Sequence, residues 1–102
     1  MQKYVAVGRL TKDPEFTHVN KAKCTFTIAV ETRKGNYQRT DFIPCVAWRE
    51  QAELIANYTV KGQQVAVSGE WRSSTYTKGG QNQTVLELEV HECQFLERPK
   101  TN

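Results

Sequence analysis

The amino-acid sequence predicts an all-β domain that contains one short helix. Segments that alternate apolar and polar residues recur along most of the chain, as in CTFTIAVET over residues 24–32. One segment, residues 49–62, changes to helical spacing and ends on glycine. The expected order is three strands, a helix and two strands. This is the order of the OB-fold, a partly open five-stranded Greek-key barrel, whereas SH3-like barrels lack the helix at this position.

The first three strands are predicted from alternation and from turn residues. Residues 3–10 alternate small or apolar side chains and are followed by the turn dipeptide Asp13-Pro14. Residues 24–32 direct their even-numbered apolar side chains inward. Residues 33–37 form a hairpin tip that contains glycine and lead into the third strand, which includes residues 40–48.

The last two strands are predicted after the helix. Residues 63–76 form the fourth strand, residues 77–83 a polar loop and residues 84–97 the final strand. We expect one OB-fold domain over residues 1–97, followed by a short flexible tail at residues 98–102.

Composition describes one small globular domain. The 102 residues are 38% hydrophobic and 25% charged, and the net charge of +3 leans toward polyanionic partners. We find no apolar run of the roughly 20 residues that span a membrane and no secretory signal, and we expect a cytoplasmic protein. Cys24, Cys45 and Cys93 lack metal-ligand spacing, so we expect reduced, partly buried thiols and neither a metal nor a cofactor.

The stretch TDFIPCVAW, residues 40–48, poses the question of which strand face is buried. Side chains an even number of positions apart lie on one face, which groups Phe42 and Trp48 with Pro44 and Val46. The opposite face then carries Ile43, Cys45 and Ala47. From the residues alone, either face can be the core, and aromatic side chains at this spacing are more often buried.

Several segments together resemble the bacterial single-stranded DNA-binding protein family. These are VAVGRLTKDPEF, TFTIAVE, TDFIPCVAWREQAELIANYTVKGQQVAVSGEWRSSTY and LELEV, in the family's order and covering nearly the whole chain. The resemblance implies an OB-fold that wraps single-stranded DNA, most often as a homotetramer, without catalysis. It also implies roles in DNA replication, recombination, repair or transfer.

The resemblance assigns stacking roles to particular aromatic residues. Phe42, Trp48 and Tyr76 fall on aromatic positions of the family that stack on bases, so the Phe42 and Trp48 face is expected to be the open one. Where the family has a further aromatic residue, this chain has Arg33-Lys34, and Tyr37 is the candidate to replace it. Each stacked base contributes ~1 to 3 kcal/mol without reading sequence.

Other positions are assigned by face or by charge. Trp71 shares a face with Val65 and Val67 and falls where the family has an aliphatic residue, so we expect it in the core. Any one of the basic residues is more often a solvated surface charge than a phosphate contact. The candidates for phosphate contacts are Arg9, Lys12, Lys21, Lys23, Arg33, Lys34, Arg39, Arg49, Lys61, Arg72 and Lys78.

Two other function classes compete with this interpretation. An enzyme is disfavoured because the acidic residues are scattered, because Glu87 and Glu89 are expected on an exposed strand edge, and because His18 and His91 lack a nucleophile partner. The alternative is a primosome-type OB adaptor that binds a replication partner protein as well as, or instead of, single-stranded DNA.

The two ends of the chain carry further expectations. It finishes at FLERPKTN, where replicative family members have a long tail with an acidic tip. In this it resembles either the short members found on plasmids, phages and mobile elements or the accessory OB proteins of primosome type. The first strand leaves an open edge, so we expect pairing with a second copy and a tetramer in preference to a dimer.

Overall fold

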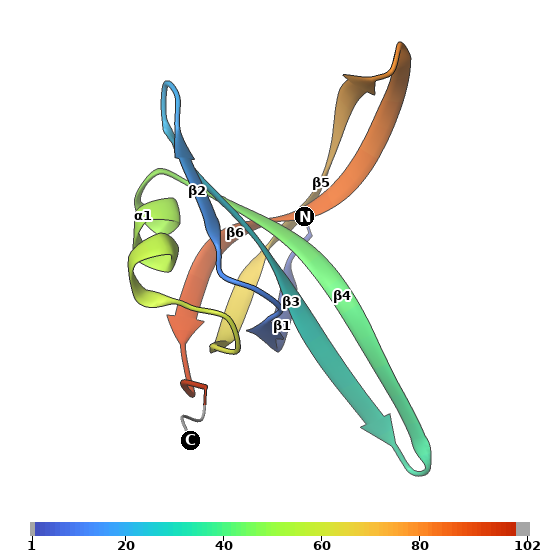
Figure 1. The fold of residues 1–102 in the computed structure, drawn as a ribbon. Coiled ribbons are helices and arrows are strands. Elements are labelled where there is room, and N and C mark those ends of the chain that lie inside the picture. The colour runs from blue at the N-terminus through green and yellow to red at the C-terminus, as the bar shows by residue number, and fades with distance from the viewer. Residues whose placement is uncertain (1, 100–102) are drawn as a thin grey trace.

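The computed structural model describes residues 2–99 as six strands and one helix (Figure 1). Their bounds are β1 (Tyr4–Leu10), β2 (Glu15–His18), β3 (Ala22–Lys34), β4 (Tyr37–Trp48), α1 (Arg49–Tyr58), β5 (Gln64–Lys78) and β6 (Gln81–Phe95). The strands form one sheet in the order β1-β5-β6-β4-β3-β2.

A second pairing of β1 closes this sheet into a barrel. β1 pairs antiparallel with β5 along Tyr4–Arg9, and its last two residues, Arg9 and Leu10, pair with Ala29 and Ile28 of β3. β4 and β6 join in parallel at Cys45 and Val46. Five strands therefore surround the core, β2 flanks β3, and α1 connects β4 to β5. This confirms the predicted OB-fold, including the position of its helix.

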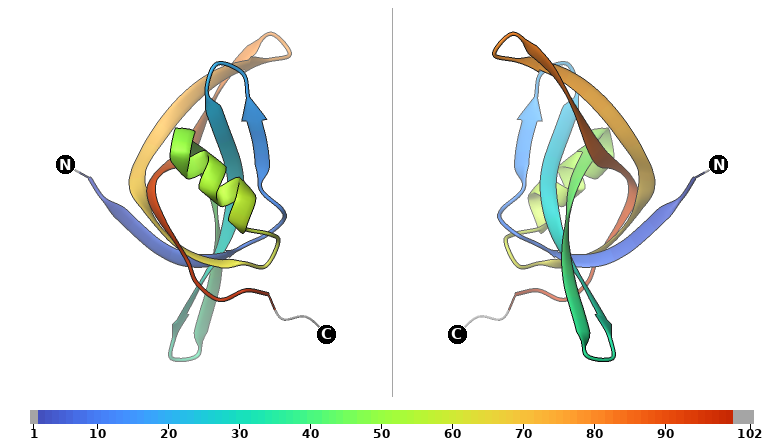
Figure 2. Two further views of the ribbon diagram at one scale, coloured as in Figure 1. Left: turned by 90° about the vertical axis from the view of Figure 1, so that its left-hand side faces the viewer. Right: turned by 90° about the vertical axis from the view of Figure 1, so that its right-hand side faces the viewer.

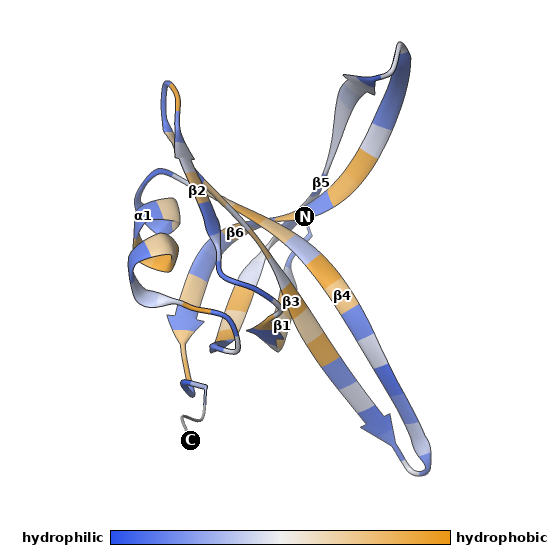
Figure 3. Ribbon diagram, viewed as in Figure 1, coloured by the Kyte–Doolittle hydropathy of each residue, from blue (hydrophilic) through white to orange (hydrophobic). Residues whose placement is uncertain are grey.

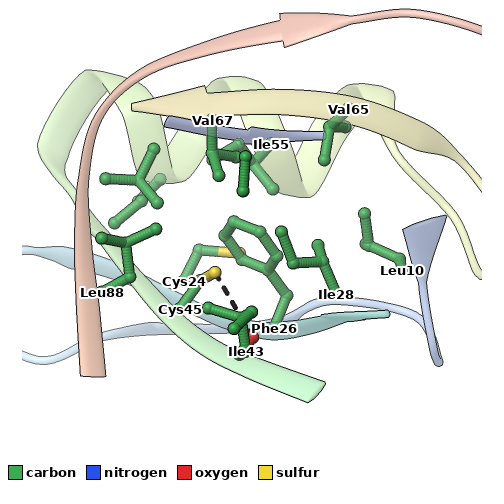
Figure 4. Packing of buried hydrophobic residues seen from close by; sticks show 14 of the residues in the cluster. Leu10, Cys24, Phe26, Ile28, Ile43, Cys45, Ile55, Val65, Val67 and Leu88 are labelled. Carbon is green, nitrogen blue, oxygen red and sulfur yellow. Dashed lines mark hydrogen bonds between the residues drawn. The ribbon is translucent and has the colours of Figure 1, made fainter. Parts of the chain in front are cut away.

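The core is built from alternate side chains of the barrel strands (Figure 4). Cys24, Phe26 and Ile28 of β3 point inward, as the period of two predicts. Ile55 of α1 is fully buried and seals the end of the barrel against which the helix lies (Figure 2). Val30, predicted to be inward as well, is only half-buried because β3 leaves the barrel at this point.

The three cysteines are free; Cys24 and Cys45 are buried in this core, and Cys93 packs against it partly buried. Burial raises the pKa of Cys24 to about 11. Burial, together with the neighbouring Cys93 and then Glu87, raises the pKa of Cys45 to about 12. Burial and the neighbouring Cys24 raise the pKa of Cys93 to about 12. The thiols are therefore protonated at neutral pH and pack as small apolar groups.

The main differences from the predicted elements are the end of the helix, a missed strand and the β5–β6 loop. The helix ends at Tyr58 because Thr59 turns extended, with its hydroxyl bonded 2.6 Å from the Ile55 carbonyl oxygen, so the predicted end at Gly62 is wrong. β2 was missed because all four of its side chains are exposed and carry no apolar alternation. The predicted polar loop at residues 77–83 is also wrong, since only Gly79 and Gly80 form the turn.

Positive φ angles at the two glycines explain the tight β5–β6 hairpin. Gly79 and Gly80 have φ of 61° and 78°, as a two-residue hairpin turn requires. Polar side chains then pair across the strands, with the hydroxyls of Thr75 and Thr84 3.4 Å apart and Thr77 donating to Asn82 at 3.0 Å. The polar character of residues 77–83 predicted a loop, but cross-strand hydrogen bonds hold the residues on either side of the turn in strands.

Two long hairpin arms leave the barrel in different directions (Figures 1 and 2). The β3–β4 arm is the distal part of that hairpin, where every side chain from Glu31 to Thr40 is exposed. The β5–β6 arm is the distal part of the other hairpin, where every side chain from Arg72 to Thr84 is exposed. Hydropathy colouring shows both tips as hydrophilic, with apolar residues concentrated near the barrel (Figure 3). The arms therefore pack no apolar core of their own and are held by hydrogen bonds between their strands. Both faces of each arm are accessible to a binding partner.

Trp71 lies where β5 leaves the barrel for its arm. Its ring packs against the edge of the core and against Tyr4, with ring centroids 5.2 Å apart. The predicted face is therefore confirmed, but the side chain is half-buried rather than enclosed.

Beyond β6, the predicted tail falls only partly within the structure. Arg98 and Pro99 follow the strand without regular secondary structure, while residues 100–102 of the predicted tail lie outside the described residues.

Candidate nucleic-acid interface

The outward face of β4 carries the first candidate platform. Ile43, Cys45 and Ala47 are buried, whereas Phe42 is 65% exposed, which confirms the predicted orientation of the strand. Phe42 stands opposite Ala29 of β3, whose small side chain leaves the ring uncovered on that side. An exposed aromatic ring beside a small residue on a rigid barrel strand can accept a flat partner.

Val46 corrects the prediction of one continuous open face. It belongs to the same pleat as Phe42 and Trp48 but is only 4% exposed, at the point where β4 is flanked by Thr25 of β3 and Glu89 of β6. The face is therefore divided into two platforms, one at Phe42 and one at Trp48. Six residues of extended strand place them roughly 20 Å apart.

Trp48 lies half-buried at the junction of β4 and α1. The Nζ atoms of Lys21 and Lys23 lie 4.4 Å and 5.3 Å from its ring centroid. A surface depression of about 310 Å³ adjoins the ring and is lined by these lysines together with residues of the β2–β3 turn. The indole thus combines a flat apolar surface with two cations at its edge.

Tyr76 provides an aromatic side chain on the β5–β6 arm. It is 43% exposed, and its hydroxyl donates to the Gln83 side-chain oxygen at 3.1 Å. Alternation places Tyr76 on one pleat with Arg72, as predicted, and Lys78 lies on the same pleat. The arm therefore presents one aromatic and two basic side chains on a single face.

Tyr37, near the tip of the β3–β4 arm, is separated from Phe42 by the pleat. It is 57% exposed and pairs with Lys34 on the pleat opposite to Phe42. Arg39 shares that pleat and donates to Asp41 at 2.9 Å; this bond and the charge of Asp41, with a smaller contribution from Tyr37, raise the pKa of Arg39. A ligand that contacts both Tyr37 and Phe42 must wrap around the arm.

Acidic side chains of β6 lie beside β4, where Glu89 is the register partner of Val46. Glu89 accepts from Arg72 at 3.0 Å and lies 3.4 Å from His91, while Glu87 accepts from Ser74 at 3.4 Å. The predicted exposed-edge position for these glutamates is wrong, because β6 lies between β5 and β4 and the Glu89 side chain is only 26% exposed. Arg72 already has an anionic partner in the free protein.

The remaining basic candidates are dispersed. Arg9 bonds to the Gly62 carbonyl oxygen at 2.8 Å and to Glu97 at 3.3 Å, and Lys12 lies 3.7 Å from Glu15. Four others are exposed and, within residues 2–99, have no carboxylate partner at salt-bridge distance: Arg33 and Lys34 on the β3–β4 arm, Lys78 at the β5–β6 turn and Lys61 after the helix.

Arg49 turns the chain from β4 into α1 with a left-handed φ of 56°. It lines a second depression with Lys21 and His18, together with Glu50 and Glu53 of the helix. The two depressions meet at Lys21, which links the Trp48 platform to the helix entrance.

Sequence reasoning did not foresee the grouping of Lys21 and Lys23 with Trp48. Both lysines were candidates only as part of a long list of basic residues. The missing element was β2, because its pairing with β3 fixes the turn that holds Lys21. Lys23, by contrast, is the direct register partner of Trp48.

Neither a metal site nor a membrane-spanning helix lies within residues 2–99. No group of three or more histidine, cysteine or acidic side chains is arranged there to hold a metal ion. Within the same range, the structure has no helix of the length and apolar character needed to cross a membrane.

Comparison with known proteins points to one family. The profile described as the single-strand binding protein family matches residues 1–96. Single-stranded DNA-binding protein 2 of Clostridium acetobutylicum is 44% identical over 103 residues, covering 95% of this chain and 77% of its own length. Single-stranded DNA-binding protein A of Bacillus subtilis is 42% identical over 103 residues, covering 95% of this chain and 60% of its own. Both relatives are therefore longer than this chain.

Proposed function

The chain belongs to the single-strand binding protein family, and we propose that it binds single-stranded DNA without regard to sequence and without catalysis. The observation that carries the proposal is the exposure of Phe42, an aromatic ring on the outward face of a barrel strand. The ring makes little contribution to the core, so we assign it the role of a surface on which bases stack.

The division of labour we propose follows from the two kinds of side chain. Bases stack on Phe42, Trp48 and Tyr76. Tyr37 stacks on a base only where the DNA strand wraps around the β3–β4 arm. Among the exposed basic residues that have no carboxylate partner within residues 2–99, we assign phosphate contacts to Arg33, Lys34, Arg49, Lys61 and Lys78. Arg9, Lys12, Arg39 and Arg72 contribute less, because binding a phosphate competes with an existing ion pair.

A fluorescence titration tests this function. We expect an unstructured oligonucleotide to quench Trp48 in a Trp71→Phe variant, in which Trp48 is the only indole. The slope of log K against log salt should be about −0.7 per neutralised phosphate, and duplex DNA should bind far more weakly because its bases are already stacked. Absence of both quenching and a mobility shift at low salt would instead favour the protein-adaptor alternative.

The chain is also expected to assemble into a homotetramer. Residues 4–8 of β1 pair with β5 on one side and, within the described residues, with no strand on the other. Val5 and Val7 are exposed beside this open edge, so a second copy can extend the sheet there. Light scattering should give about four times the 11.7 kDa chain mass, and a concentration-independent monomer would contradict this assembly.

Cellular roles follow from the proposed binding. Coating of single strands protects the intermediates of replication, recombination and repair, and we place this activity in the cytoplasm. Replication proteins are further candidate partners.

A further inference from the structure

The two lysines beside Trp48 occupy the place that a stacked base would need. Lys23 lies on β3 directly opposite Trp48, and Lys21 reaches the ring from the β2–β3 turn. Their Nζ atoms are 4.4 Å and 5.3 Å from the ring centroid, which is the range of cation–π contacts. In the free protein, the ammonium groups therefore lie against the surface expected to receive DNA.

The balance of interactions favours an exchange when DNA binds. A base stacked on an aromatic side chain contributes more than a cation–π contact at an exposed site. Lys21 is exposed, and a lysine side chain has a long rotatable stem, so its ammonium group can leave the ring without disturbing the barrel. A nucleotide that stacks on Trp48 also brings a phosphate to within the length of a lysine side chain.

The charges around Trp48 determine which cations can bind the phosphate of an arriving nucleotide. Within residues 2–99, no ion pair joins Lys21 or Lys23 to a carboxylate, whereas Arg72 on the β6 side is held by Glu89. Glu50 and Glu53 of α1 line the neighbouring depression, where Arg49 and His18 also lie. The lysines are therefore the cations beside Trp48 that a phosphate can bind without first displacing a carboxylate.

We propose that the β2–β3 hairpin is a phosphate-binding extension of the DNA interface, in which a base displaces Lys21 from Trp48 and Lys21 and Lys23 bind the adjacent phosphates. This inference rests on the proposed function. The inference assigns a path to the bound DNA strand: beyond β4 it runs toward the β2–β3 turn and away from the acidic side chains of β6.

Single substitutions test the inference in the Trp71→Phe parent. Lys21→Gln and Lys23→Gln should each reduce the magnitude of the salt slope by about 0.7, which weakens binding about fivefold at 0.1 M salt. Lys21→Arg should retain the slope because it keeps the charge. Arg98→Gln, which removes an equal charge beyond β6, is the matched control and should behave as the parent.

The free protein offers an independent readout. Lys21→Gln should change the emission of Trp48 before any DNA is added, because the cation nearest to the ring is removed. Thermal unfolding of each variant verifies that the barrel is intact.

The possible results separate the two proposals. If the parent neither binds nor shows quenching, the proposed function fails and the inference falls with it. If the parent binds with quenching of Trp48 but both lysine variants match Arg98→Gln, the inference alone is overturned.

Discussion

Replacing Phe42 with alanine should weaken binding of single-stranded DNA by about 1–3 kcal/mol, or roughly 5- to 150-fold in Kd. The ring is 65% exposed, on a strand whose opposite face is packed into the core. Its truncation therefore removes a stacking surface but creates no cavity. Fluorescence or mobility-shift titrations at fixed salt measure the affinity, and the midpoint of thermal unfolding should change little.

Two controls separate stacking from other effects of the substitution. Phe42→Tyr keeps a ring and should bind nearly as the parent, whereas Phe42→Leu keeps apolar bulk without a ring and should resemble the alanine variant. Pro44→Ala alters the next exposed side chain on the same pleat and should leave binding close to normal. Should Phe42→Ala lower the unfolding midpoint and retain full affinity, the ring would have a structural role instead.

Alternation along strands allowed much of the fold to be predicted. Given the outward placement of Phe42 that the family resemblance implies, a period of two assigns Ile43 and Cys45 to the core, and it also places Arg72 and Tyr76 on one face. It cannot say which strands will flank a residue. Val46 follows the exposed pleat of Phe42 but is buried between β3 and β6, and only the parallel pairing with β6 explains this.

The candidate site was less predictable than the fold. Aromatic residues were recognisable because few residue types provide a flat surface, whereas basic residues are common and their roles depend on neighbours. The pairing of Arg72 with Glu89 joins two strands, and the contact of Lys21 with Trp48 joins the β2–β3 turn to β4. Both depend on strand register, which the sequence pattern left open wherever polar residues prevailed.

Gly69 has the largest expected effect on stability. The β5–β6 pairing shifts there, from Ser68 opposite Glu92 to Gly69 opposite Val90, so that His91 is the extra residue of a bulge. A Cβ atom at Gly69 would lie 1.8 Å from the carbonyl oxygen of Glu89, an overlap that only a backbone shift can relieve. The glycine therefore permits the bend at which the two strands leave the barrel for their arm.

Gly69→Ala should consequently destabilise the domain by about 3 kcal/mol or more, at or above the upper end of ordinary overpacking. For a domain of this size, the midpoint of thermal unfolding should fall by more than roughly 12 °C, as measured by circular dichroism. Ser68→Ala, beside the bulge, should be nearly neutral. Gly79→Ala meets no atom within 4 Å but has a φ of 61°, so it should cost only about 1 kcal/mol. If Gly69→Ala unfolds within a few degrees of Ser68→Ala, the bulge tolerates a side chain, and close packing against Glu89 does not explain the glycine.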